Sequence, residues 1–258
     1  MQRRLYRNPP IEEAVCTFRF EPGAAPVTDL DDHLHQLIRT EFARREEAKQ
    51  LEARLTVGRD GPTHDVRILD ETVFSNEGRT MYVHVGPNVL SIRYRKPYEG
   101  WERFWSAISL AYQSYREVAA PKMINGISLR YVNRLEIAPA EAGLSHYFNF
   151  YPHWHETLPA APDAFMMAVQ FQVPDSPDVL RIHIGSVGRR NGHLQVVLDL
   201  EVFFARSPSL ALDDAEDWLQ RAHSQVVAAF EGCIREPLRE RFDSGEVQHG
   251  GGAGAAHG

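Results

Sequence analysis

Arginine side chains recur at alternate positions along three segments that are rich in β-branched and aromatic residues. Alternate residues of a strand point to opposite faces of a sheet, so each segment presents its polar side chains on one face. If the strands share one sheet, these side chains gather on an open face that could bind a peptide, a phosphate group or a nucleic-acid strand. The predicted binding residues are Arg93, Arg95, Arg130, Asn133, Arg134, Arg181 and His183.

The same spacing is also typical of a solvated sheet face that binds nothing. In this second interpretation the arginines form ion pairs with carboxylates of neighbouring strands, and Asp199, Glu201 and Glu136 are the expected partners. Both interpretations use the same residues, so a face that captures a partner and a face that is neutralised internally stay open as alternatives.

The sequence holds 12 histidines, and the densest group is His146, His153 and His155. A His-x-His pair on a strand places two imidazoles on one side, where they can chelate zinc. This segment is rich in proline, however, which favours an exposed loop, and no further ligand stands out. We therefore predict neither a metal nor a cofactor.

The sequence motifs of the common catalytic sites are absent. There is no P-loop, no dinucleotide-binding G-x-G-x-x-G, no H-E-x-x-H and no G-x-S-x-G. The two cysteines, Cys16 and Cys233, lie in apolar segments and are interpreted as buried small residues rather than nucleophiles. No segment approaches the ~18 apolar residues of a membrane span, and no apolar run marks a secretory signal. We expect a cytoplasmic protein that does not contact a membrane.

The formal net charge of -7 is unevenly distributed. Residues 1–125 carry 18 basic and 18 acidic residues, whereas residues 126–258 carry 10 and 17. Nucleic-acid binders usually show an excess of basic residues, because phosphate neutralisation needs lysine and arginine. Nucleic acid is therefore the less favoured partner of the open face.

The periodicity of apolar residues predicts an alternating series of strands and helices. The expected strands are Ala14–Phe20, Arg54–Val57, Val66–Phe74, Met81–Val85, Val89–Arg95, Ile127–Ile137, Phe165–Val173, Val179–Val187 and Leu194–Phe204. The expected helices are Asp29–Leu55, Trp101–Val118, Ala140–Tyr147 and Asp213–Ile234, the last of them opened by an Asp213-x-x-Glu216 capping pattern. Hairpin loops are expected at Gly86–Asn88 and Gly188–Gly192.

Both halves of this series have the order strand, helix, antiparallel strands, long helix. The sequence thus predicts an α+β protein with an internal duplication, in which residues 1–125 and 126–244 share one sheet and place their long helices on one face. Residues 245–258 are rich in glycine and alanine and are expected to form a flexible tail. An unpaired edge of the shared sheet would also allow a homodimer.

Two sequence elements resemble those of a known family. The opening Asn8-Pro9-Pro10-Ile11-Glu12-Glu13-Ala14-Val15 and the strand Leu129–Arg134 are similar to motifs of a sporadically distributed family of uncharacterised bacterial proteins of about this length. The ending is similar too, with His223, Phe230, Ile234, Leu238 and Phe242. The resemblance implies a bacterial origin and carries no catalytic residue or cofactor with it. The order of elements is also similar to the TATA-binding protein saddle and to helix-grip folds, by analogy of topology alone.

We therefore expect a non-enzymatic binding or assembly protein that captures a protein partner, in the setting of a mobile-element or defence locus. One alternative is an enzyme with a dispersed site, in which His183 or His153 acts beside the arginines in hydrolysis or phosphate-ester chemistry. Another is nucleic-acid binding on the open sheet face, for which steep salt dependence would be the signature.

Overall fold

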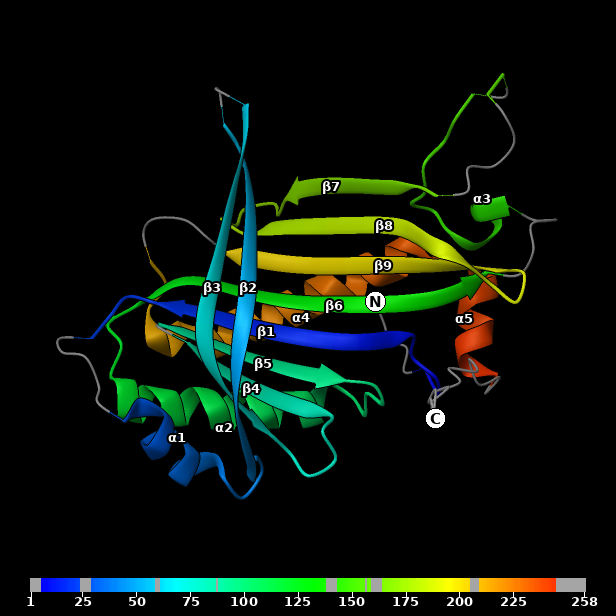
Figure 1. The fold of residues 1–258 in the computed structure, drawn as a ribbon. Helices are drawn as coiled ribbons and strands as arrows, with labels where there is room; N and C mark the ends of the chain where they lie inside the picture. The colour runs from blue at the N-terminus through cyan, green and yellow to red at the C-terminus, as the bar shows by residue number, and fades with distance from the viewer. Residues whose placement is uncertain are drawn as a thin grey trace, which may run out of the picture.

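The computed structural model describes residues 6–23, 29–58, 61–86, 88–137, 143–155, 157–158, 164–204 and 209–244, with residues 48–70 described by their backbone alone. Within these ranges one antiparallel sheet of nine strands has the order β2-β3-β4-β5-β1-β6-β9-β8-β7 (Figure 1). The strands are β1 (Ile11–Phe20), β2 (Arg44–Gly58), β3 (Gly61–Ser75), β4 (Met81–Gly86), β5 (Val89–Arg95), β6 (Ile124–Ile137), β7 (Met166–Gln172), β8 (Val179–Arg190) and β9 (His193–Phe204). The predicted α+β class is confirmed.

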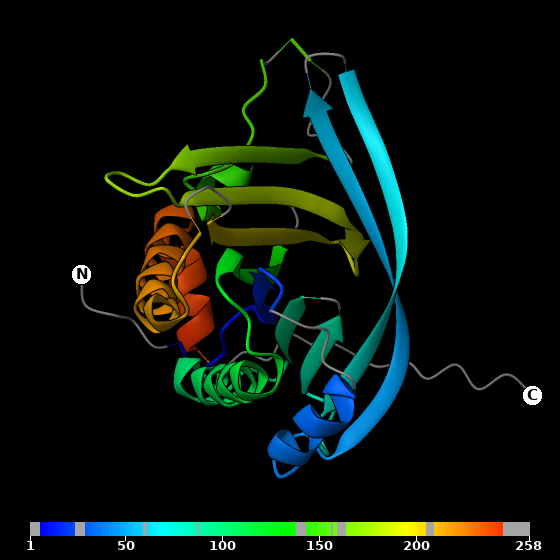
Figure 2. The ribbon, with the colours of Figure 1, turned by 90° about the vertical axis from the view of Figure 1, so that its left-hand side faces the viewer.

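The helices of the described residues are α1 (Leu30–Ile38), α2 (Trp101–Ala119), α3 (Gly143–Tyr147), α4 (Ala215–Cys233) and α5 (Glu236–Asp243), with a 3₁₀ turn at Leu212–Asp214. The two long helices lie on the same side of the sheet, α2 against β5 and α4 against β6 and β9 (Figures 1 and 2). This agrees with the predicted placement of the long helices. No helix in this part of the chain is both long and apolar enough to span a membrane.

Side chains alternate between the two faces of β6, which lies at the centre of the sheet. Leu129, Tyr131 and Leu135 are buried on the side of the helices, whereas Arg130 and Arg134 are exposed on the opposite side. The side without helices, which bears these arginines, is called the open face below. The alternation arises because successive strand residues point to opposite faces, and only one face is covered by helices.

The aromatic face of α2 anchors this helix to β1. Tyr112 stacks on Phe18 at 4.6 Å between ring centroids, and Tyr115 stacks on Phe20 at 4.7 Å. All four side chains are buried. The spacing of apolar residues in the sequence predicts this face of α2, and burial of large aromatic rings is the main term that holds such a helix on a sheet.

The long helix predicted over Asp29–Leu55 is wrong. α1 ends at Ile38, and the chain continues as β2, which pairs with β3 from Arg44↔Ser75 to Gly58↔Gly61. The segment after Ile38 is rich in glutamate, arginine and alanine. These residues favour a helix over a strand by only tenths of a kcal/mol each, roughly. The ladder with β3 runs the full length of β2, on the one side of this edge strand that has a neighbour, and it overrides that preference. The strands expected at Arg54–Val57 and Val66–Phe74 are parts of this one hairpin.

The β2–β3 hairpin crosses in front of the open face in Figure 1. In the turned view of Figure 2 it lies on the side of the sheet opposite to α2 and α4. The sheet therefore has helices on one side and the backbone of a long hairpin on the other.

Turns lie at both positions where the sequence predicts hairpins. The second turn is shorter than the predicted Gly188–Gly192, because β8 extends to Arg190, and Pro87 of the first lies outside the described residues. Asn88 joins β4 to β5 with a φ of 59°, and Asn191 and Gly192 join β8 to β9 with φ of 50° and 82°. At Asn191 and Gly192, two positive φ angles in succession are typical of the type I′ turn that matches the twist of paired strands.

Two predictions about helix beginnings need correction. The capping pattern at Asp213 is wrong, because Leu212–Asp214 forms the 3₁₀ turn and α4 begins at Ala215 without a side-chain cap. The short helix expected over Ala140–Tyr147 begins at Gly143, and residues 138–142 lie outside the described residues, as does the predicted tail.

We expect that Asp178→Ala lowers the free energy of unfolding by ~2 kcal/mol, because it leaves the buried Trp218 indole N–H without an acceptor. Asp178 Oδ1 accepts from Trp218 Nε1 at 2.8 Å and joins the β7–β8 turn to α4. Urea unfolding measures the loss. The control is Asp213→Ala, which removes an exposed partner of Arg116 and should cost less than ~0.5 kcal/mol. Equal losses in the two variants would contradict the structural role of Asp178.

Candidate functional site

The structure gathers six of the seven predicted binding residues on the open face. Arg93 and Arg95 lie on β5, Arg130 and Arg134 on β6, and Arg181 and His183 on β8. The strand register aligns them in rows. Arg130 lies opposite Glu201, which in turn lies opposite Arg181.

These arginines are mostly engaged by carboxylates of the same face. Arg130 donates two hydrogen bonds to Asp199, from Nε at 2.8 Å and from Nη2 at 2.6 Å. Arg181 donates to Glu201 at 2.9 Å, and His183 Nδ1 lies 3.8 Å from Asp199. The hydrogen bonds with Asp199 raise the pKa of Arg130 above its usual value. A cavity of 150 Å³ lies among these five side chains.

The two arginines of β5 also lie near a carboxylate of the open face, but at longer distances. Glu13 lies 3.3 Å from Arg95 Nε and 3.9 Å from Arg93 Nη1. Of the carboxylates expected to neutralise the face, Asp199 and Glu201 do so, whereas Glu136 accepts a hydrogen bond from Gln195. A ligand of the open face would therefore compete with intramolecular ion pairs.

Asn133, the seventh predicted residue, lies on the other side of the sheet. It has the strand parity of Tyr131 and Leu135, and it is 2% exposed. It donates Nδ2 to the backbone carbonyls of Leu198, at 3.1 Å, and of Tyr131, at 3.4 Å. Both of these side-chain hydrogen bonds use Nδ2, and Oδ1 is the acceptor atom of the side chain.

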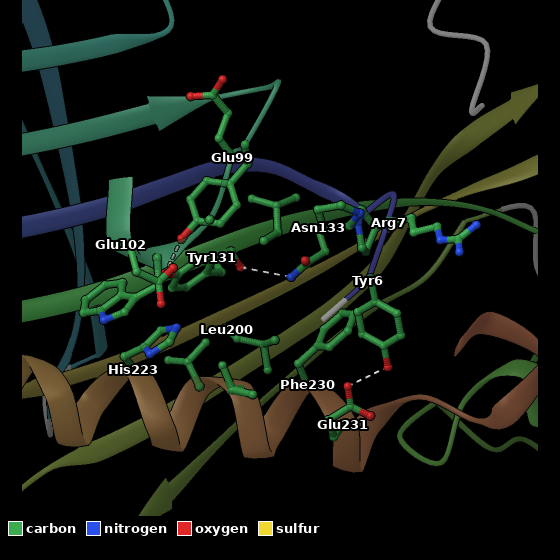
Figure 3. Close-up of a pocket in the computed structure, with 18 residues that line it drawn as sticks. Tyr6, Arg7, Glu99, Glu102, Tyr131, Asn133, Leu200, His223, Phe230 and Glu231 are labelled. Atoms are coloured by element: carbon green, nitrogen blue, oxygen red, sulfur yellow. Dashed lines mark hydrogen bonds between the residues drawn. The ribbon is translucent and has the colours of Figure 1, made fainter. Parts of the chain in front are cut away.

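A cavity of 480 Å³ lies beside Asn133, between the sheet and α4 (Figure 3). We call it the arm cavity, because the N-terminal arm that leads into β1 forms one of its walls. The other walls are the loop and first residues of α2, the central strands β6 and β9, and one face of α4. Its lining comprises Tyr6, Arg7, Pro9, Pro10, Ile11, Tyr98, Glu99, Gly100, Trp101, Glu102, Tyr131, Asn133, Leu200, His223, Val226, Val227, Phe230 and Glu231.

The arm is held in place by bonds at both of its ends. Asn8 N donates to Phe242 O of α5, and Pro10 O accepts from Arg134 N of β6, each at 2.9 Å. Tyr6 donates its hydroxyl to Glu231 of α4 at 2.6 Å. The consecutive prolines keep the backbone between these contacts extended, because proline fixes φ and restricts the residue before it.

Aromatic rings form the end of the cavity nearest to α2. The His223 imidazole stacks on the Trp101 indole with centroids 4.0 Å apart and planes 5° apart. The hydroxyls of Tyr98 and Tyr131 lie 3.0 Å from each other, and their rings meet edge to face. The four rings come from three segments that are far apart in the sequence, so they meet only in the folded chain.

Carboxylates lie at the rim of the same end. Glu99 and Glu102 are exposed and line the cavity on either side of Gly100 and Trp101. Glu99 accepts a hydrogen bond from the Tyr94 hydroxyl at 2.9 Å. Burial and this bond raise the pKa of Tyr94 to about 12, so Tyr94 stays a donor at neutral pH.

Part of this site could be found in the sequence, and part could not. Asn133 is a polar residue at the parity of a buried strand face, and His223 and Phe230 belong to the ending quoted for the resemblance. These two signals are visible in the sequence itself. Tyr98, Glu99 and Glu102 carry no local signal, because an exposed loop before a helix commonly contains such residues.

The other candidate groups do not assemble into a site. Within the described ranges, no three histidine, cysteine, aspartate or glutamate side chains are grouped as metal ligands would be. Both thiols are buried, and burial raises the pKa of Cys233 to about 12 and that of Cys16 well above its usual value. Thiolates are the reactive form of cysteine, so neither residue is suited to be a nucleophile.

A comparison with protein-family models gives no match for this chain, and a comparison with curated proteins gives none either. The resemblance to a bacterial family therefore stays a prediction.

A double-mutant cycle tests whether Arg130 is committed to its partner. Arg130→Ala and Asp199→Ala should couple by ~1 kcal/mol in the free energy of unfolding, because the pair is bidentate and Asp199 is largely buried. The matched control is Arg79–Glu46, at 2.6 Å with both side chains 55% exposed. It should couple by less than ~0.5 kcal/mol. Coupling near zero for Arg130 and Asp199 would mean that the guanidinium is available to an external partner.

Proposed function

We propose that this protein is a non-enzymatic binding protein whose arm cavity takes a small organic ligand. The observation that carries the proposal is the cavity itself. Its 480 Å³ fall within the ~300–1,000 Å³ of typical small-molecule sites. Its walls combine aromatic rings with a few polar groups, as ligand sites usually do.

The segments singled out in the sequence meet at this cavity. Pro9, Pro10 and Ile11 of the opening motif line it together with Tyr131 and Asn133 of the strand motif. These two motifs are more than a hundred residues apart and are brought together by the pairing of β1 with β6. If the cavity binds a ligand, both motifs contribute to the same binding site, and this supports the proposal.

The chemistry of the lining favours binding over catalysis. Among the described lining residues there is no serine, threonine, cysteine or lysine that could form a covalent intermediate. Glu231, which could act as an acid or base, accepts from Tyr6 and lies 2.8 Å from Arg239 Nε. The other polar groups of the lining are Glu99 and Glu102 at the rim, the imidazole of His223 and the Asn133 side chain, and most of the remaining wall is aromatic or aliphatic.

We further propose that the two halves of the chain arose by duplication. In support, β1 and β6 are neighbours at the centre of the sheet, and each is flanked by the last strand of its own half, β5 or β9. Each half then ends in a long helix on the same face. The arm cavity lies where elements of both halves meet, so one half alone would not form it.

Filling the cavity should abolish binding. Val227 lines the cavity from α4, whereas the adjacent Ala228 is exposed. N-phenyl-1-naphthylamine, a neutral apolar fluorophore, should bind the protein with a stoichiometry of one. Val227→Trp should weaken this binding by about tenfold or more, which corresponds to ~1.4 kcal/mol.

The matched control is Ala228→Trp, which adds the same ring outside the cavity and should change the affinity less than about twofold. Fluorescence titration measures both, and the urea midpoint checks that each variant is folded. The proposal fails if the probe does not bind, or if both tryptophan variants bind it as tightly as the parent protein.

A further inference from the structure

The two edge strands of the sheet, β2 and β7, differ in charge (Figure 1). The sequence of β2, RREEAKQLEARLTVG, is rich in charged residues, whereas that of β7, MMAVQFQ, contains none. Charged side chains, proline and bulges are the features by which edge strands avoid pairing with other chains. Along Met166–Gln172 the β7 strand has no proline and no shift of register, so it has none of these three protections.

The backbone of β7 alternates between groups that bond to β8 and groups that point away from it. Phe165 O accepts from Ser186 N, and Val173 N donates to Asp178 O, each at 3.0 Å. Both pairs keep the register of the β7–β8 ladder, and the bonds of an antiparallel ladder fall on alternate residues. The odd-numbered residues of β7 therefore face β8, and the N–H and C=O groups of even-numbered residues such as Ala168 point outward.

Exposed apolar side chains gather at the same edge. Of the five large apolar side chains that are exposed within the described residues, four lie on β7, on β8 or in the segment that precedes β7. A single exposed apolar residue is ordinary, whereas a group of them at an unprotected edge is typical of an interaction surface. The four residues are Leu158, Met166, Phe171 and Val187.

A row of apolar residues follows the helix side of β7. Val169 lies opposite Ile182 of β8, which is buried, and residues directly opposite each other share a face of the sheet. Met167 and Phe171 have the same parity as Val169. Because α4 packs mainly on β6 and β9, this row is only partly covered: Met167 and Val169 are half-buried, and Phe171 is 45% exposed.

The strand that fits this edge best is a second copy of β7. When two copies pair antiparallel about a two-fold axis at Val169, each Val169 lies opposite its own copy, and Met167 lies opposite Phe171 of the second copy. All contacts along the row are then apolar on both sides. In such an interface a residue at the axis meets its own copy, so a charge there would be repelled, and β7 carries no charge along its length.

We propose that two copies of this protein associate through β7, so that their nine-stranded sheets join into one continuous antiparallel sheet. The outward backbone groups of the two strands form the new ladder, and the apolar row is buried where the strands meet. None of the residues that line the arm cavity lies on β7 or β8, so this inference does not depend on the proposed function.

Size-exclusion chromatography with multi-angle light scattering tests the inference on the full chain. The parent protein should have twice the mass of one chain. Ala168→Pro should have the mass of one chain, because proline removes an outward N–H and obstructs a neighbouring strand without removing a bond to β8. The matched control is Ala168→Thr, which keeps the N–H and should stay dimeric. Far-ultraviolet circular dichroism checks that both variants keep their strands.

Single cysteines locate the two-fold axis and do not require the proline variant to fold. Cys16 and Cys233 are buried, so an introduced exposed thiol reacts alone. With oxidised glutathione, Val169→Cys should form a disulfide-linked dimer, because its copy lies within the ~4.4–6.8 Å between Cα atoms that a disulfide needs. Phe171→Cys is the control. It is more exposed but lies four residues from its copy along the strand, roughly 14 Å, and should not cross-link.

Three results would overturn the inference. A parent protein with the mass of one chain would show that a second copy does not cover this edge, which would then be open to a strand of another protein. An Ala168→Pro variant that is folded and still dimeric would place the contact on another surface. Cross-linking through Phe171→Cys alone, or through neither cysteine, would contradict the pairing of β7 about Val169.

Discussion

β1 and β6 pair antiparallel at the centre of the sheet, from Ile11↔Asn133 to Phe20↔Ile124. The two strands come from different halves of the chain, and one face of both is covered by α2 and α4. Because strand side chains alternate with period two, this register decides which residues are buried and which face outward. A shift by one residue would bury Arg130 and expose Tyr131. The register irregularity between Ile11 and Glu13 also places the end of the proline arm beside Asn133, which forms the arm cavity.

The two faces created by this pairing have different chemistry. On the open face, charged residues of neighbouring strands neutralise one another, with Arg130 and Asp199 as the best-defined pair. Partly exposed ion pairs of this kind contribute little net stability and would have to be broken before they could bind anything else. On the helix face, aromatic rings and single polar groups surround a cavity. A ligand there would gain burial and directed hydrogen bonds without breaking an existing ion pair, and this difference favours the cavity as the binding site.

The alternation of residues in β5, β6, β8 and β9 was sufficient to predict strands, a shared sheet and the position of six of the seven binding residues on one face. The helix predicted over Asp29–Leu55 was wrong. Helix propensity depends on local sequence only, whereas this segment is a strand because it pairs with β3, which lies further along the chain. The prediction that groups Asn133 with the arginines is wrong, because Asn133 has the strand parity of Tyr131, and the alternation of residues in the sequence already shows this. The cavity was not predictable, because Tyr6, Tyr98, Asn133 and His223 are brought together only by tertiary contacts.

The most direct test of the binding site is the set of nuclear Overhauser effects between bound N-phenyl-1-naphthylamine and valine methyl groups. Val226 and Val227 line the arm cavity, whereas Val15 and Val132 have the strand parity of the open face. The account predicts contacts from the probe to Val226 and Val227 and none to Val15 or Val132. Contacts to Val15 and Val132 instead would place binding on the open face and contradict the assignment of the arm cavity.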